Sequence, residues 1–244
     1  QMLAMDVQET INYAFVDANL LQDWQLDQDA VALANPLSAE LAVMRTSLLP
    51  GLVKTLTNNS ARQQTRLRFF EMGRVFSQQD AAAPLERQML GAVFCGSSWP
   101  EQWSVKSAPV DFYDVKAMLD AVLAGSGFSA SYRVSDKAFM HPGRSADVLV
   151  DGQAVGVIGA LHPHMNKLLD LPGDVFAFEL DLSALPQRPL PKASTVSRFP
   201  SVRRDLALLV PESVAWGEIE RCVSATLGAR LQSALSAAVV VFIV

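Results

Sequence analysis

Long apolar runs and cysteine are both scarce in this chain of 244 residues. No apolar run reaches the ~18 residues that a membrane-spanning helix requires, and no signal peptide is visible, so the sequence indicates a cytoplasmic protein without a membrane segment. The two cysteines, Cys95 and Cys222, are too few for a disulfide framework, which fits a reducing compartment. Both lie in apolar contexts, and we expect both thiols to be buried in the core.

A strong charge of either sign is also absent. The chain carries 20 Lys and Arg residues against 25 Asp and Glu residues, so it is not a generally basic RNA-coating protein, although a local basic patch is compatible with this balance. Half of the residues are hydrophobic and 18% are charged, which is typical of a soluble globular protein. The length allows one large domain or two moderate ones. The first residue is Gln and not Met, which indicates a piece of a longer chain.

Residues that could catalyse a reaction or bind a metal lack the neighbouring side chains that such a site requires. His162 and His164 could form a metal pair, but no Cys, Asp or Glu stands beside them at ligand spacing, so a structural turn is the better interpretation. His141 has no Ser or Cys nucleophile arranged with it, which favours a structural or interface role. Glu179 and Asp181 could chelate Mg2+ or act as an acid–base pair, but we expect strand carboxylates that face a polar interface. The sequence therefore predicts no metal ligands.

One stretch, residues 35–76, organises the chain. Ser47 stands where the N-cap of a helix would, and Pro50 lies inside the first turn. The Asn58-Asn59-Ser60 cluster should end this helix, four arginines follow, and the aromatic-rich residues 67–76 are typical of a strand. An apolar stripe runs along the helix at helical spacing, formed by Leu48, Leu49, Leu52, Val53 and Leu56.

The remaining pattern predicts strands interleaved with helices, an α+β fold. Asp151-Gly152 between two apolar runs predicts a β-hairpin, and Asp111 with Asp114 predicts a capping box at the start of a helix over residues 111–124. Trp99 and Trp103 lie in a predicted loop; they could stack a base, but we expect them to pack under that loop. Further strands are predicted over residues 8–16, 89–95, 146–150, 153–160, 176–182, 206–210 and 239–244, and further helices over residues 163–170 and 213–227.

A proline-rich and basic segment divides the chain. Prolines at positions 186, 189 and 191 break any regular element, so residues 184–197 form a predicted linker. From residue 182 to residue 204 there is no acidic side chain, whereas five basic ones are present, namely Arg188, Lys192, Arg198, Arg203 and Arg204. We therefore expect two domains, at residues 1–183 and 198–244.

Six segments, in a fixed order, carry a family resemblance. They are MRTSLLPGL at residues 44–52, RFFEMGRVF at 68–76, DFYDVKAMLDAVL at 111–123, HPGRSADVLVDGQAVGVIGALHP at 141–163, FAFELDL at 176–182 and SRFPSVRRDLALLV at 197–210. In these segments the chain closely resembles the C-terminal half of the large (beta) subunit of bacterial phenylalanyl-tRNA synthetase. The resemblance implies that the first domain is a non-catalytic core shaped like a class II synthetase, built on an antiparallel sheet. It implies that the second domain is the opening part of a ferredoxin-like (βαββαβ) anticodon-binding domain.

The resemblance also implies a function. The large subunit of this family supports ATP-dependent attachment of phenylalanine to tRNA(Phe), by assembling with the catalytic alpha subunit into an alpha2beta2 heterotetramer and by binding tRNA. ATP and Mg2+ serve the whole enzyme, and we expect neither to bind to this chain. In the catalytic subunit a Gly-Arg-Val-Tyr-Arg segment supplies an ATP-binding arginine, whereas Ser77 ends the comparable segment here and cannot supply a bidentate cation. The third signature motif of class II synthetases, a glycine-rich strand-to-helix turn that ends in arginine, has no convincing match in this sequence. The nearest candidate is residues 156–159. No catalytic residue is therefore expected.

The same resemblance suggests site residues. Arg198, Arg203 and Arg204 are candidates for tRNA binding, with solubility of the linker as the alternative. Candidates for the subunit interface are Arg62, Arg66, Glu71, Arg74, His141 and Arg144. Two other interpretations stay open: a stand-alone RNA-binding module, and a free-standing ligase-like paralogue that binds ATP and an amino acid itself.

Overall fold

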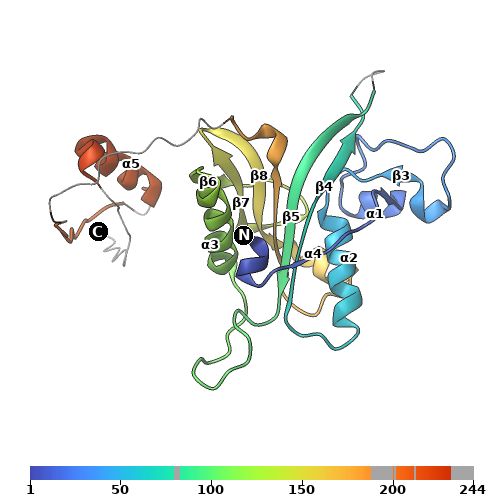
Figure 1. Cartoon of the computed structure of the whole chain (residues 1–244), viewed down its shortest axis with the longest axis horizontal. Coiled ribbons are helices and arrows are strands. Elements are labelled where there is room, and N and C mark those ends of the chain that lie inside the picture. Colours follow the sequence, from blue (N-terminus) through green and yellow to red (C-terminus); the bar gives the residue numbers. More distant parts are fainter. Residues whose placement is uncertain (80–82, 188–199, 201, 212, 232–244) are drawn as a thin grey trace. The chain divides into compact units, whose positions relative to one another are not determined.

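A seven-stranded mixed sheet forms the centre of the chain (Figure 1). The computed structural model describes residues 1–79, 83–187, 200, 202–211 and 213–231. The strand order is β1-β4-β5-β9-β8-β7-β6, in which the edge strand β1 runs parallel to β4 and all other neighbours are antiparallel. The strands are β1 (Gln8–Glu9), β4 (Leu67–Ser77), β5 (Leu85–Cys95), β6 (Ala130–Val134), β7 (Met140–Val150), β8 (Gln153–Leu161) and β9 (Phe176–Asp181). With the helices around it, this sheet makes the α+β domain that the sequence predicts.

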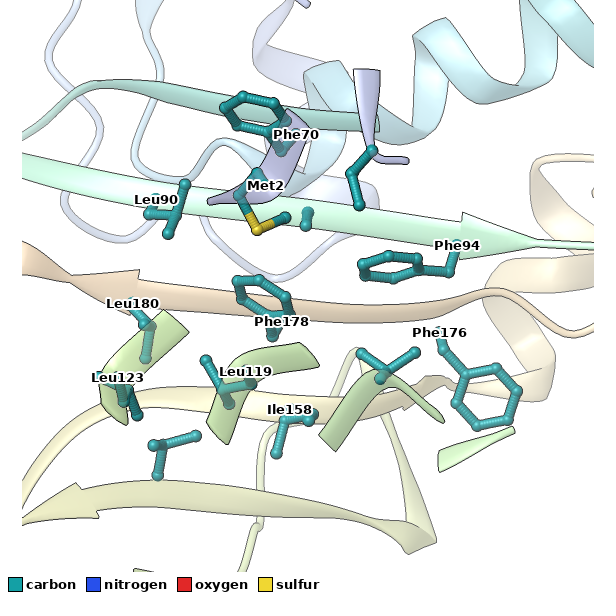
Figure 2. Packing of buried hydrophobic residues seen from close by; sticks show 14 of the residues in the cluster. Met2, Phe70, Leu90, Phe94, Leu119, Leu123, Ile158, Phe176, Phe178 and Leu180 are labelled. Carbon is teal, nitrogen blue, oxygen red and sulfur yellow. The ribbon is translucent and has the colours of Figure 1, made fainter. Parts of the chain in front are cut away.

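Both faces of the sheet are covered, so the sheet lies between two apolar cores. Helix α2 (Leu49–Ser60) packs against β4 and β5, and α3 (Phe112–Gly125) packs against β8 and β9 on the other face (Figure 1). Successive side chains of each strand point to opposite faces: Phe69 joins the α2 core, whereas Phe70 joins the α3 core. Figure 2 shows Leu119 and Leu123 of α3 in the same layer as side chains from several strands of the sheet.

The helix starts follow the local sequence closely. Asp111 accepts the backbone N–H of Asp114, and Asp114 accepts that of Asp111, which confirms the capping box at the start of α3. Helix α2 ends at Ser60, as predicted, and Pro50 lies in its first turn. The N-cap position of α2 is Leu48 and not Ser47, so that prediction was wrong by one residue. The Ser47 hydroxyl oxygen nevertheless accepts the N–H of Leu49 at 3.1 Å.

The Asp-Gly hairpin is confirmed between β7 and β8. Asp151 has a φ of 52° and Gly152 a φ of 80°, the pair of positive values that a tight two-residue turn of this kind requires. A short helix, α4 (Pro163–Leu168), follows β8 as the sequence predicts.

The predicted strand over residues 8–16 was wrong as a single element. The segment breaks into β1 and β2 (Phe15–Val16), and β2 pairs with β3 (Val43–Met44) in a separate two-stranded sheet. Ile11 and Tyr13, between them, are 93% and 78% exposed, so the alternation of residue types there does not reflect a buried face. The remaining elements before the linker are η1 (Met2–Met5), α1 (Ala18–Asp23), η2 (Ala39–Leu41) and η3 (Leu182–Ala184).

The chain divides into two units, Gln1–Arg188 and Pro189–Val244. In the second unit the structure describes α5 (Trp216–Leu227), which confirms a helix in the predicted region, and η4 (Gly228–Arg230). The strand predicted over residues 206–210 was wrong, because these residues have no ladder partner among those the structure describes. The strand predicted over residues 239–244 and most of the predicted linker lie outside the described residues.

Two further findings concern the two cysteines and the search for a membrane-spanning helix. Cys95 is buried on β5 as expected, but Cys222 is exposed on α5, so the prediction of a buried thiol there was wrong. Among the residues that the structure describes, no helix is both long enough and apolar enough to cross a membrane.

Candidate functional site

A buried ion pair lies where the N-terminal segment, the segment from β3 through α2, and β4 meet. Arg45 and Glu71 are 6% and 3% exposed, and Nη1 of Arg45 lies 2.6 Å from Oε1 of Glu71. Asn12 donates to Oε2 of Glu71 at 2.7 Å and accepts from the Thr55 hydroxyl at 2.8 Å. Arg45 Nε also donates to the carbonyl of Arg74 at 2.9 Å. Because most polar atoms of the pair are satisfied, the network fixes three segments of the chain against each other.

Sequence reasoning found Glu71 but missed Arg45. Glu71 was predicted to lie at a subunit interface, and the structure places it inside the fold of this chain instead. Arg45 stands between Met44 and Thr46 next to an apolar helix, and Glu71 is the only acidic residue of β4, which also contains Arg68 and Arg74. A single base beside an apolar helix and a single acid in an aromatic-rich strand are the signal that could have paired them. A Cβ atom at Gly73 would collide with Arg45 Nη2, so the glycine makes room for this guanidinium.

A second buried carboxylate belongs to Glu179 on β9. Its Oε1 accepts the N–H of Leu48 at 2.6 Å, and both of its oxygens lie 3.0 Å from the Ser47 hydroxyl. Burial raises the pKa of Glu179 above its ordinary value, although its hydrogen bonds and two nearby arginines act in the opposite direction. The prediction that this strand is half-buried with its carboxylates on a polar face was wrong, because both faces of β9 are covered. Glu179 holds the start of α2 against the sheet.

Asp181 has a separate structural role. Its carboxylate accepts the N–H groups of Ser183 and Ala184 at the start of η3, and it lies 3.6 Å from Arg87. Within the described residues no group of three or more His, Cys, Asp or Glu side chains lies close enough together to hold a metal ion. Glu179 and Asp181 are therefore each bound to neighbouring backbone groups and do not share a common site.

Two of the predicted interface arginines, Arg62 and Arg66, line one small hollow of about 230 Å³ together with Arg68, and we call it the arginine hollow. Arg66 pairs with Asp6 at 2.6 Å, and Arg68, 7% exposed, donates to the carbonyl of Ser98. Burial lowers the pKa of Arg68, and the positive charge of Arg66 lowers this pKa further. Arg62 is exposed and donates to the carbonyl of Asn58 at 3.4 Å. The lining of the hollow is Asp6, Gln8, Asn59, Arg62, Gln64, Arg66, Leu67, Arg68 and Phe69.

The other interface candidates lie elsewhere on the first unit. Arg74 forms an exposed ion pair with Glu86 at 2.7 Å and does not reach the arginine hollow. Arg144 pairs with Asp174 at 2.7 Å, and its guanidinium lies 5.8 Å from the centre of the Phe176 ring, within cation–π range.

The three histidines take part in turns. His141 Nδ1 accepts the N–H of Gly143 at 3.0 Å, and His162 Nδ1 accepts the N–H of His164 at 3.1 Å at the start of α4. Each of these bonds spans only two residues, so the rings stabilise the local backbone.

A larger hollow of about 650 Å³ lies at the end of the sheet where β5 ends and β9 begins; we call it the sheet-end hollow. It is lined by parts of residues 60–65, 95–97, 107–111 and 172–176, together with Arg144. Beside it runs the tryptophan loop, residues 96–110, in which Trp99 and Trp103 are 59% and 99% exposed. The prediction that these tryptophans pack under the loop was therefore wrong.

The predicted tRNA-binding arginines belong to the second unit. Arg203 and Arg204 are both exposed, and Arg203 Nε lies 4.0 Å from Asp205. Arg198 lies outside the described residues. The structure therefore leaves Arg203 and Arg204 accessible and does not test whether they bind RNA.

The segment compared with the ATP-binding motif ends inside the fold. Ser77, at the end of β4, is 9% exposed, and its hydroxyl carries no positive charge. Residues 156–159 lie within β8, and not at a strand-to-helix turn. A Cβ at Gly156 would collide with the carbonyl of Glu179, so this glycine permits close packing of β8 against β9. Apolar side chains fill both faces of the sheet. The buried charges of Arg45, Glu71 and Glu179 bind neighbouring elements of the fold to each other.

Comparisons with known proteins agree over nearly the whole chain. Residues 1–182 match the family model described as "Phenylalanyl tRNA synthetase beta chain CLM domain". The chain is similar to proteins named phenylalanine–tRNA ligase beta subunit: it is 53% identical over 234 residues to that of Xanthomonas oryzae pv. oryzae (strain MAFF 311018), and 50% identical over 234 residues to that of Xylella fastidiosa (strain Temecula1 / ATCC 700964). Each alignment covers 95% of this chain but 30% of the relative, so the chain spans about 30% of the length of these curated relatives.

Proposed function

The chain belongs to the phenylalanyl-tRNA synthetase beta chain family, and we propose that it acts as a scaffold within a phenylalanine–tRNA ligase beta subunit. In this proposal the first unit assembles with a catalytic alpha subunit in an alpha2beta2 heterotetramer. That assembly attaches phenylalanine to tRNA(Phe) with ATP and Mg2+, and the chemistry takes place on the alpha subunit. The observation that carries the proposal is a seven-stranded sheet whose two faces are both filled by its own side chains.

The residues present do not fit a nucleotide. A triphosphate needs preorganised cations that converge on it, and the segment compared with the ATP-binding motif ends in the buried, uncharged Ser77. The arginine hollow, at about 230 Å³, is smaller than the ~300 Å³ at which small-molecule pockets begin. Two of its three guanidinium groups already bind Asp6 and the carbonyl of Ser98.

For the fold of the first unit we propose the class II synthetase core. The support is a sheet with six strands in antiparallel order and one short parallel edge strand, together with the family match over residues 1–182. For the second unit we propose the opening part of a ferredoxin-like anticodon-binding domain. Helix α5 supports that assignment, and the described residues 202–211 add no strand to it.

For tRNA binding we propose the exposed Arg203 and Arg204, with Arg198 as a third candidate. Exposed arginines can bind phosphate oxygens of an RNA backbone without reading its sequence. Replacing Arg203 and Arg204 together by Gln should weaken tRNA binding by the alpha–beta pair and reduce its salt dependence.

Copurification tests the proposed assembly. The chain is coexpressed with a tagged alpha subunit of a related ligase, and the complex is analysed by size-exclusion chromatography with light scattering. The proposal predicts a stable complex that contains both chains. Elution of the two as separate species would contradict it and would favour a free-standing ligase-like protein or a stand-alone RNA-binding module.

A further inference from the structure

The tryptophan loop exposes more aromatic surface than a free loop of a globular protein normally does. Trp103 is 99% exposed, Trp99 is 59% exposed, and Val105, two residues after Trp103, is 42% exposed. Tryptophan buries a large apolar area in most of its structural settings, and two exposed indoles within five positions form an apolar patch that water solvates poorly. Such patches on soluble domains mark surfaces that a partner covers.

The base of this loop is closed by hydrogen bonds. Ser98 donates its N–H to the carbonyl of Ala108 at 2.8 Å, and Val110 donates to that of Gly96 at 2.9 Å. The guanidinium of Arg68, on strand β4 of the sheet, donates a hydrogen bond to the carbonyl of Ser98. The loop therefore projects from a fixed base between β5 and α3, as the green segment in Figure 1 shows. A fixed base lowers the entropy that a partner must remove when it binds the tip.

The sheet-end hollow lies directly beside that base. Ser107 and Pro109 of the loop line the hollow, and Arg144 and Phe176 line it as well. Exposed tryptophan and arginine side chains next to a cavity are typical of the centre of a protein interface, whereas Phe176, 3% exposed, belongs to the core beneath the hollow.

The charges around the loop favour a protein partner over RNA. The loop contains one acid, Glu101, and one base, Lys106. Of the arginines near it, Arg66 is paired with Asp6 and Arg144 with Asp174. An RNA backbone needs unpaired cations beside the stacking rings, and this surface is close to neutral.

We propose that the tryptophan loop and the sheet-end hollow form a docking surface for the alpha subunit. The partner contributes an apolar slot for the indole of Trp103 and a polar rim that faces Glu101, Lys106 and Arg144. This inference rests on the proposed function, since it names the surface through which that assembly forms.

The test measures binding of the alpha subunit to the full chain and to three variants, Trp103→Ala, Trp99→Ala and the control Leu37→Ala. Leu37, 88% exposed, is an apolar side chain in a different loop. Trp103→Ala should weaken binding by at least tenfold, because truncation of a central interface tryptophan costs more than ~1.4 kcal/mol. Leu37→Ala should leave the affinity unchanged. Since Trp103 is almost fully exposed, its loss should not alter the unfolding midpoint of the free chain.

A fluorescence difference gives a second readout. Subtracting the emission of Trp103→Ala from that of the wild-type chain isolates the signal of this one indole, which should shift to shorter wavelength when the alpha subunit covers it. Equal affinity of wild type and Trp103→Ala, with no shift, would overturn the docking surface and leave the proposed assembly intact. No binding of the alpha subunit to the wild-type chain would overturn both. If tRNA alone shifts the signal, and Trp103→Ala weakens tRNA binding, the surface belongs to RNA and the inference is overturned.

Discussion

At the scale of single residues, the buried Arg45–Glu71 pair carries the sharpest stability prediction. Arg45→Met removes the cation and leaves the carboxylate of Glu71, 3% exposed, without its charge partner. Loss of one member of a buried pair costs about 3–5 kcal/mol in the free energy of unfolding. Urea unfolding followed by circular dichroism measures this loss.

The exposed pair of Arg74 and Glu86 provides the matched control for that experiment. Arg74→Met breaks an ion pair of 2.7 Å whose side chains are 66% and 49% exposed, and it should cost less than about 1 kcal/mol. The double variant Arg45→Met, Glu71→Leu should recover most of the stability lost in Arg45→Met, because neither charge of this pair then remains buried. Equal costs for Arg45→Met and Arg74→Met would contradict the structural role of the buried pair.

Glu179 predicts an unusual dependence of stability on pH. Its pKa is raised in the folded chain, so the folded state binds the proton more tightly than the unfolded state does. The stability that this group contributes is therefore full at low pH and falls as the pH rises above ~4.3, the ordinary value for glutamate, until the raised pKa is passed. Glu179→Gln keeps an acceptor for Leu48 and does not titrate.

The measurement for Glu179 is the difference in unfolding free energy between Glu179→Gln and the wild type across a pH series. This difference should increase in favour of the variant as the pH rises through that window. Leu37→Ala, which changes an exposed apolar side chain and removes no ionisable group, should show no such increase. A difference that stays constant, or that decreases with rising pH, would show that burial is not the dominant influence on the pKa of Glu179.

At the scale of elements, the capping box of α3 should contribute measurably to stability. Asp111→Ala removes the acceptor that binds the N–H of Asp114 at 2.9 Å, which should cost about 1 kcal/mol. Hydrogen exchange at the first turn of α3 should also become faster. Asp136→Ala is the control, since Asp136 is exposed and makes no side-chain hydrogen bond or ion pair within the part of the chain that the structure describes. If the two variants unfold alike, the cap contributes nothing beyond its charge.

Elements whose signals are local could be predicted from the sequence. The Asp151-Gly152 turn, the capping box at Asp111 and the end of α2 at Ser60 each depend on residues within a few positions of one another. The strand predicted over residues 206–210 fails for the opposite reason. A strand needs a partner, and apolar composition alone does not supply one.

The candidate site depends on contacts between residues far apart in the chain, which the sequence alone does not predict. Ser47 and Glu179 are separated by 132 positions, and Arg45 and Glu71 by 26, so neither contact follows from spacing in a helix or strand. The tryptophans illustrate the same limit, because Trp24 is 1% exposed and Trp103 is 99% exposed although both directly follow a polar residue. Whether a ring is covered depends on segments that lie far away in the chain.

At the scale of the whole molecule, we propose that the first unit supports the chemistry of a partner and has no nucleotide site of its own. Isothermal titration of ATP with Mg2+ and phenylalanine into the chain alone, and into its complex with the alpha subunit, tests this claim most directly. We expect no binding to the chain alone and binding of both substrates to the complex. Micromolar binding of ATP to the chain alone, lost on replacement of Arg62, Arg66 or Arg74, would contradict this claim.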